Sequence, residues 1–125
     1  MLTLHLGTPL DLDVTGPGDC YRDPDSGVTS VGAVTESGSG TWTTEQYEVV
    51  DISLGYGPSL PGLQIGLVRD DRTNIVFRQT ADAQVVEHVA TDGHSGTMRF
   101  DVLPLLADSD VTEPQQISGT IEWIC

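Results

Sequence analysis

Short runs in which apolar and polar residues alternate with a period of two recur along this chain. Leu2, Leu4 and Leu6 alternate with polar residues at the start of the sequence, and Ile121 and Trp123 do so near its end. A strand turns successive side chains to opposite faces, so each run predicts a β-strand with one buried face. No stretch has the 3.6-residue period of an amphipathic helix. The pattern therefore favours a protein built from half-buried strands.

Turn-forming residues divide these runs into about eight to ten short strands. The expected strands span residues 2–6, 10–14, 28–34, 41–54 (one strand or two), 63–67, 75–78, 85–90, 97–103 and 115–125. We expect loops or turns at residues 15–27, 37–40, 55–62, 69–74, 91–96 and 104–114. Strands in this number must bury their apolar faces against each other, in a sandwich or a barrel. We predict an all-β, antiparallel β-sandwich forming one domain over residues 1–125.

The chain has two cysteines, Cys20 and Cys125. Cys125 lies at the inward phase of the last predicted strand, and Cys20 lies in the loop after the second. Either both are free core thiols, which would suit the cytosol, or they form a disulfide, which needs an oxidising compartment. We favour the disulfide Cys20–Cys125. It would close a loop of roughly a hundred residues, worth up to about 4.7 kcal/mol in the chain-entropy model.

The net charge of the chain is −14, from five basic residues and nineteen acidic ones. Such a surface repels nucleic-acid phosphates and anionic lipid headgroups, so we exclude both as main partners. No apolar run is long enough to span a bilayer as a helix. Met1 leads directly into the first alternating run, without a signal peptide. We expect that it replaces a targeting segment removed from an exported protein.

Two segments near the end of the chain resemble small actinobacterial envelope lipoproteins, including the mycobacterial lipoprotein-antigen family. They are Gly93-His94-Ser95-Gly96-Thr97-Met98-Arg99-Phe100 and Ile117-Ser118-Gly119-Thr120-Ile121-Glu122-Trp123-Ile124-Cys125. The earlier Thr15-Gly16-Pro17-Gly18-Asp19-Cys20 is similar to the first cysteine site of that family. The resemblance implies a secreted or surface-anchored protein, held to the membrane only through a lipid anchor that this sequence lacks. It supplies no catalytic residue.

Two groups of side chains have the chemistry of metal ligands. His88, Asp92 and His94 flank a predicted hairpin, where a transition metal would find nitrogen and oxygen ligands. A polar hairpin tip is the simpler interpretation, because the spacing matches no established motif. A second group suits calcium because it places carboxylates on one loop, although its order departs from an EF-hand. It consists of Asp19, Asp23 and Asp25.

The sequence contains no pattern that indicates catalysis. It has no Gly-x-Ser-x-Gly nucleophile motif, and the cysteines are better explained by a bridge. Aromatic residues make up 6%, which is little for a sugar-binding cleft. Trp42, Tyr47, Tyr56 and Trp123 could line a pocket between the sheets, but we expect Trp123 to pack on the disulfide and the tyrosines to lie at strand edges.

We therefore expect a non-enzymatic binding or structural module of the cell envelope, with an unknown protein or small ligand as its partner and no cofactor. Two alternatives stay open. One is a calcium- or transition-metal-binding β protein, and the other is a carrier of a small apolar ligand between the sheets.

Overall fold

The computed structural model of the chain describes residues 1–17, 19–22, 36–55, 62–90 and 95–124, with the backbone alone at 19–22, 36–39, 55 and 89. These residues form ten strands and no helix, so the described part contains no helix able to cross a bilayer. The strands are β1 (Leu2–Leu6), β2 (Leu12–Gly16), β3 (Asp19–Arg22), β4 (Glu36–Trp42), β5 (Val49–Gly55), β6 (Leu63–Val68), β7 (Asn74–Arg78), β8 (Gln84–Val89), β9 (Ser95–Pro104) and β10 (Gln116–Ile124).

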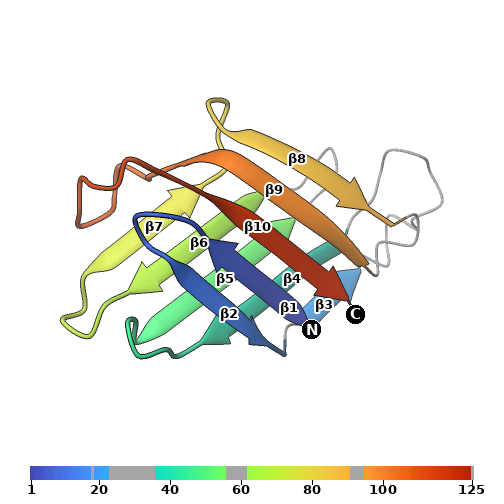
Figure 1. The fold of residues 1–125 in the computed structure, drawn as a ribbon, viewed down its shortest axis with the longest axis horizontal. Coiled ribbons are helices and arrows are strands. Elements are labelled where there is room, and N and C mark those ends of the chain that lie inside the picture. The colour runs from blue at the N-terminus through green and yellow to red at the C-terminus, as the bar shows by residue number, and fades with distance from the viewer. Residues whose placement is uncertain (18, 23–35, 56–61, 91–94, 125) are drawn as a thin grey trace.

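The strands form two five-stranded antiparallel sheets that face each other, which confirms the predicted all-β class and layered architecture. The front sheet has the order β2-β1-β10-β9-β8, and the back sheet has the order β3-β4-β5-β6-β7. The strands of the two sheets cross steeply instead of running alongside each other (Figure 1). This arrangement is typical of orthogonal packing.

All but one of the strand pairs join strands that are consecutive in the sequence. The exception is the pair of β1 with β10, in which Leu2 lies opposite Trp123 and Leu6 lies opposite Gly119. The two described ends of the chain therefore lie side by side, and the Met1 carbonyl accepts a hydrogen bond from the Ile124 N–H at 2.9 Å. The chain follows a simple meander around the molecule, without a Greek-key crossover.

The chain passes between the sheets at two corners. At the first, β2 of the front sheet ends at Gly16 and β3 of the back sheet begins at Asp19, so only two residues separate them in the sequence. At the second, β7 of the back sheet ends at Arg78 and β8 of the front sheet begins at Gln84. Leu105, which follows β9, forms an isolated bridge with Phe77 of β7 and so links the two sheets. Direct connections from one sheet to the other are typical of orthogonal packing.

The space between the sheets is filled by apolar side chains. Twenty hydrophobic residues with described side chains are buried there, and most of them occupy the inward positions of the alternating runs. They are Leu2, Leu4, Leu6, Leu12, Val14, Tyr47, Val50, Ile52, Leu54, Leu63, Ile65, Leu67, Ile75, Phe77, Met98, Phe100, Leu103, Ile117, Ile121 and Trp123. The inward positions of Ile117, Ile121 and Trp123 confirm the face predicted for the last strand.

Two of the loop predictions are wrong. Residues 37–40 lie within β4, and Cys20 lies within β3, which pairs with β4. The indole of Trp42 explains how a glycine-rich segment becomes a strand. A Cβ atom at Gly40, or at Gly16 in the front sheet, would come within 3.0 Å of this ring. The tryptophan therefore lies over both glycines and provides the apolar cover that they lack.

The free edge of β7 is covered by the segment that follows β9. The Ser109 hydroxyl accepts a hydrogen bond from the Val76 N–H at 2.9 Å, and the Asp110 carboxylate accepts one from the Asn74 N–H at 2.9 Å. The Leu106 N–H donates in turn to the Val76 carbonyl at 2.7 Å. These bonds occupy backbone groups that would otherwise be open to pairing with another chain.

Tyr47 is also placed differently from the prediction. It lies in the turn between β4 and β5 and is 7% exposed, so it belongs to the core and not to a strand edge. The Tyr47 N–H donates to the Thr44 hydroxyl at 3.0 Å, and the Thr44 N–H donates to the Tyr47 carbonyl at 2.9 Å. This tight turn directs the ring onto the core. The prediction for Tyr56, and that for a strand at residues 28–34, fall outside the described residues.

Candidate functional site

The outer face of the front sheet carries polar side chains in rows that cross the strands. One row joins His88 on β8, Thr97 on β9 and Glu122 on β10, because these residues are paired in the registers of the two ladders. The adjacent row joins Val86, Arg99 and Thr120 on the same strands. Residues directly opposite on one face lie close enough for their side chains to touch. The two rows therefore make a continuous surface.

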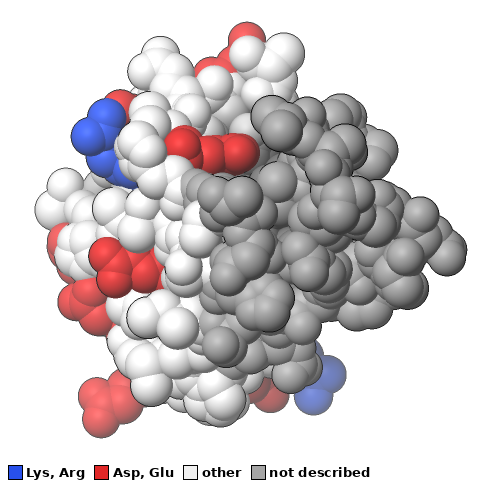
Figure 2. Space-filling view, turned by 90° about the vertical axis from the view of Figure 1, so that its right-hand side faces the viewer, with Lys and Arg blue, Asp and Glu red and all other residues white. Residues whose placement is uncertain are grey.

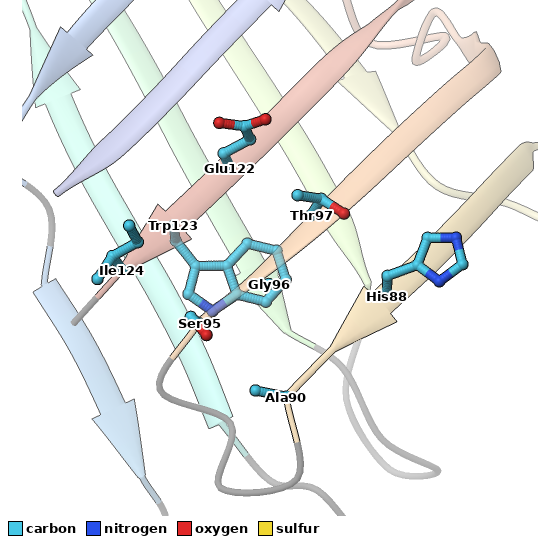
Figure 3. Close-up of a pocket in the computed structure, with 8 residues that line it drawn as sticks. All are labelled: His88, Ala90, Ser95, Gly96, Thr97, Glu122, Trp123 and Ile124. Carbon is cyan, nitrogen blue, oxygen red and sulfur yellow. The ribbon is translucent and has the colours of Figure 1, made fainter.

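Two shallow hollows lie on either side of the row His88–Thr97–Glu122. The hollow with a volume of about 310 Å³ is also lined by Trp123 and Ile124, at the end of β10 (Figure 3). The other, of about 240 Å³, is also lined by Val86, Arg99 and Thr120. Both are open to solvent, unlike the deep clefts that enclose most of a small ligand. Their shape suits side chains presented by a partner.

Gly96 and Trp123 both line the first hollow. A Cβ atom at this position would lie within 3.0 Å of the Trp123 indole, which covers the glycine from the neighbouring strand (Figure 3). Trp123 is only 3% exposed, so it belongs to the core and contributes one edge to the hollow.

The three large hydrophobic residues that are exposed in the described part of the chain all lie on this outer face. They are Met1 at 66%, Ile124 at 68% and Val86 at 42%. Met1 and Ile124 are hydrogen-bonded neighbours at one end of the sheet. Single exposed hydrophobic residues are common, but their concentration beside the two hollows is informative. We call Val86, His88, Thr97, Arg99, Glu122 and Ile124 the β8–β10 surface.

The β8–β10 surface ends at a strand edge. The Ala90 N–H donates to the Ser95 carbonyl at 2.9 Å, so the backbone of Ala90 is directed at β9. Backbone groups alternate in direction along an antiparallel strand, so those of His88 and Val86 also point to β9, and those of Glu87 and Val85 point away. No second strand among the described residues pairs with β8.

The hydroxyl and the backbone N–H of Thr73 lower the pKa of the exposed Asp71 carboxyl, which lies in the β6–β7 turn and not on the β8–β10 surface. Acidic side chains are scattered over the described part of the end shown in Figure 2, and basic ones lie at its margins. A partner for this molecule is therefore expected to be neutral or basic.

The predicted transition-metal group is not brought together by the described residues. His88 is exposed on β8, whereas Asp92 and His94 lie outside the described part of the chain. In the calcium group, the backbone of Asp19 is described in β3, and Asp23 and Asp25 are outside. Where side chains are described, no three His, Cys, Asp or Glu residues cluster around a common point. His5 and Asp13 form an exposed pair across β1 and β2.

The predicted disulfide also involves side chains that lie outside the described part of the chain. The backbone of Cys20 lies in the edge strand β3, its side chain is not described, and Cys125 lies beyond the described residues. Trp123 packs over Gly96, as its ring position shows. The pairing of Cys20 with Cys125 therefore stays a prediction.

The interior gives no support to a carrier between the sheets. The hollows formed by described residues that we find lie on the outer faces or at an end of the sandwich. Between the sheets, residues such as Phe77, Phe100 and Ile52 are 0% exposed. An apolar ligand would have to displace this close-packed core.

Two residues of the β8–β10 surface, Val86 and Ile124, were not predicted from the sequence as candidate site residues. Val86 follows Val85, and Ile124 follows Trp123, so each breaks the alternation of its strand by placing an apolar residue at an outward position. An apolar residue out of phase is the signal that would have indicated them. Thr97 and Glu122 gave no signal, because polar residues are ordinary at outward positions.

No family model, no curated protein and no solved structure matches this chain.

Proposed function

We propose that this protein is a non-enzymatic binding module of the cell envelope or the secreted fraction, and that it holds a partner protein on the β8–β10 surface. The observation that carries the proposal is the concentration of exposed apolar residues beside two open hollows and beside the edge of β8, with which no other described strand than β9 pairs. The interior is filled by the protein's own side chains, so recognition takes place on the outside.

The shape of the surface favours an extended segment of the partner. A row of polar side chains separates the two hollows, so alternate side chains of an added strand or loop would fall on either side of it. Val86 and Ile124 offer apolar contact, and Arg99, Glu122 and His88 offer hydrogen bonds. The edge of β8 supplies backbone groups of Glu87 and Val85 for strand pairing.

The assignment to the envelope rests on the cysteine argument and on the resemblance to envelope lipoproteins. A disulfide between Cys20 and Cys125 requires an oxidising compartment. The acidic surface is compatible with such a place, because it disfavours contact with nucleic acid. Fractionation of the native host with an antibody against this chain would test the compartment. Recovery in the cytosolic fraction alone would contradict it.

The binding proposal can be tested by retention of partners from an envelope extract of the host. We compare the unaltered protein with Val86→Arg and Ile124→Arg, which place a charge in the apolar positions, and with Thr15→Arg on β2 of the same sheet. Thr15 is exposed on the same face, so its variant is matched in charge and in face.

We expect a protein retained by the unaltered chain and by Thr15→Arg to be lost, by at least about tenfold, with Val86→Arg or Ile124→Arg. Each variant must keep the thermal unfolding temperature of the unaltered chain within a few degrees. Equal retention by all four proteins would contradict the proposal, because the β8–β10 surface would then be irrelevant to the contact.

A further inference from the structure

A glycine in the centre of the back sheet has no explanation in the packing of the protein itself. Gly66 lies in the middle of β6, which has β5 and β7 on its two sides. Glycine inside a strand weakens it and often marks a place where another molecule approaches closely. A Cβ atom at Gly40, Gly96 or Gly119 would come within 3.0 Å of neighbouring atoms, whereas at Gly66 its nearest neighbour would be the Cβ of Asp51 at 3.9 Å.

Gly66 is the floor of a hollow on the outer face of the back sheet. The hollow has a volume of about 480 Å³ and is walled by three half-buried valines, Val49, Val68 and Val76. The register places Asp51 of β5 and Val76 of β7 directly on either side of Gly66. The missing side chain therefore leaves a depression in which the three valines lie beside polar residues, namely Thr41, Asp51, Gln64 and Asn74.

The carboxylate of Asp51 is oriented by one hydrogen bond and retains capacity for another partner. The Thr41 hydroxyl donates to its Oδ1 at 2.9 Å. No arginine or histidine of the described residues forms an ion pair with Asp51. Arg78, on the adjoining row, donates its Nε–H to the Gln64 carboxamide oxygen at 2.9 Å. A carboxylate can accept about four hydrogen bonds, so Asp51 is open to an external donor.

A depression lined by valines, beside a carboxylate that forms no ion pair with a described residue, suits a side chain with an aliphatic stem and a cationic head. We propose that this hollow, the Gly66 hollow, binds an arginine side chain of a partner protein. The stem packs on the valines over Gly66, and the guanidinium donates to Asp51. The planar fork of five N–H donors matches a carboxylate better than an ammonium group does. The net charge of −14 draws a basic partner to the molecule.

This site is independent of the β8–β10 surface, since it lies on the other sheet and faces the opposite way. The molecule would thus have two recognition faces. A failure at one of them leaves the other untouched, so the two proposals are tested separately.

The test is a titration of ¹⁵N-labelled protein with the blocked peptide acetyl-Gly-Arg-Gly-amide, followed by NMR. Comparison peptides carry citrulline, which keeps the shape without the charge, or lysine. The variants are Gly66→Val, which fills the hollow, and Asp51→Asn, which keeps the acceptor for Thr41 and removes the charge. Asp101→Asn is the control, because it removes one exposed carboxylate from the front sheet.

We expect saturable shifts at the amides of Gly66, Asp51 and Val68, with affinity reduced by about tenfold or more in Gly66→Val and in Asp51→Asn. Asp101→Asn should bind as the unaltered chain does. Gly66→Val should melt at the same or a higher temperature, because the added side chain enters open space. If Gly66→Val does not fold, the affinity of Asp51→Asn for the arginine peptide still tests the proposal.

Three results would overturn the proposal. Chemical-shift changes spread evenly over the acidic surface would show that the peptide is attracted by the net charge and not bound in the Gly66 hollow. Equal binding of the citrulline peptide would remove the role of Asp51, and equal binding of the lysine peptide would remove the preference for a guanidinium group.

Discussion

Glycines in this protein fall into two kinds, which differ in what a side chain would meet. At Gly119 a Cβ atom would come within 3.0 Å of the His5 carbonyl oxygen and would press on the Phe100 ring. The β9–β10 register also shifts between Ile117 and Gly119, so the glycine sits at an irregularity where the backbones approach closely. Gly66, by contrast, faces open space.

This difference predicts opposite effects of the same substitution. Gly119→Ala should lower the free energy of unfolding by about 1–3 kcal/mol, because the methyl group forces β1 and β10 apart. Gly66→Ala should raise it by up to about 1 kcal/mol, because alanine restricts the unfolded chain and meets no neighbour. Urea denaturation of both variants measures the two changes. Similar losses in both would contradict the distinction.

The turn between β6 and β7 contains a carboxyl with a lowered pKa, that of Asp71. The Thr73 N–H donates to the Asp71 carboxylate at 2.9 Å, and the Thr73 side chain lowers the pKa of the same carboxyl further. Because the folded pKa lies below the unfolded one, the bond adds stability above the ordinary pKa of aspartate. That contribution is lost as the pH falls through the lowered value.

We expect an NMR titration of the carboxyl carbon of Asp71 to show a midpoint below the ordinary value of aspartate. Thr73→Val, which removes the hydroxyl and keeps the backbone N–H, should raise the midpoint part of the way toward the ordinary value of aspartate. Since Asp71 is fully exposed, global stability should hardly change with either state of the carboxyl. An unchanged midpoint in Thr73→Val would show that the side chain has no part in the shift.

Strands β8 and β7 differ in whether other described residues cover their outer edges. The segment after β9 covers β7 with backbone and side-chain hydrogen bonds, whereas no described strand pairs with the outer edge of β8. Natural sheets usually protect such edges, and an edge left open is a place where another chain can add a strand. This contrast is the structural basis for placing recognition at β8.

The direction of the β8 backbone can be tested with a pair of proline variants. Val86→Pro removes an N–H that is directed at β9, whereas Glu87→Pro removes one that is directed outward. We expect Val86→Pro to be more destabilising by about 1–2 kcal/mol, through the lost ladder hydrogen bond. Thermal and urea unfolding of the two variants provide the comparison. If Glu87→Pro were the more harmful, the proposed edge would face β9.

The alternating runs predicted most strands of the front sheet and the later strands of the back sheet, because burial of one face enforces a period of two. The sequence did not predict β3 and β4. Their segments contain Gly38, Gly40 and several serines, which have low strand propensity, and β4 pairs along its length with β5. The cover that Trp42 gives to Gly16 and Gly40 is a tertiary contact, and no local pattern encodes it.

The proposed recognition surfaces were predicted less well than the fold. The sequence pointed to His88 through its neighbours in the chain, and the structure places His88 instead beside Thr97 and Glu122 from other strands. Sites on a sheet are assembled across strands, so their members are distant in sequence. Gly66, between Ile65 and Leu67, was detectable as a glycine inside a strand pattern, but its meaning depends on the empty space above it.

At the scale of the whole molecule, the cysteine prediction has a direct measurement. We expect the protein purified without reductant to show no reactive thiol in denaturant, and two after reduction. Reduction should also lower the unfolding temperature, because the bridge would restrict the unfolded chain by up to about 4.7 kcal/mol. Two reactive thiols before reduction would remove the physical argument for an oxidising compartment.

The place of β10 in the front sheet has a consequence for how the protein is made. The five strands of the back sheet leave the ribosome in the order in which they pair, so each finds its neighbour at once. The front sheet waits, because its central strand, β10, is the last of the ten described strands to be synthesised. Until then the β1–β2 and β8–β9 hairpins lack the strand that joins them, and their apolar faces are not fully covered. A nascent chain that ends before residue 116 should therefore be a target for chaperones and proteases.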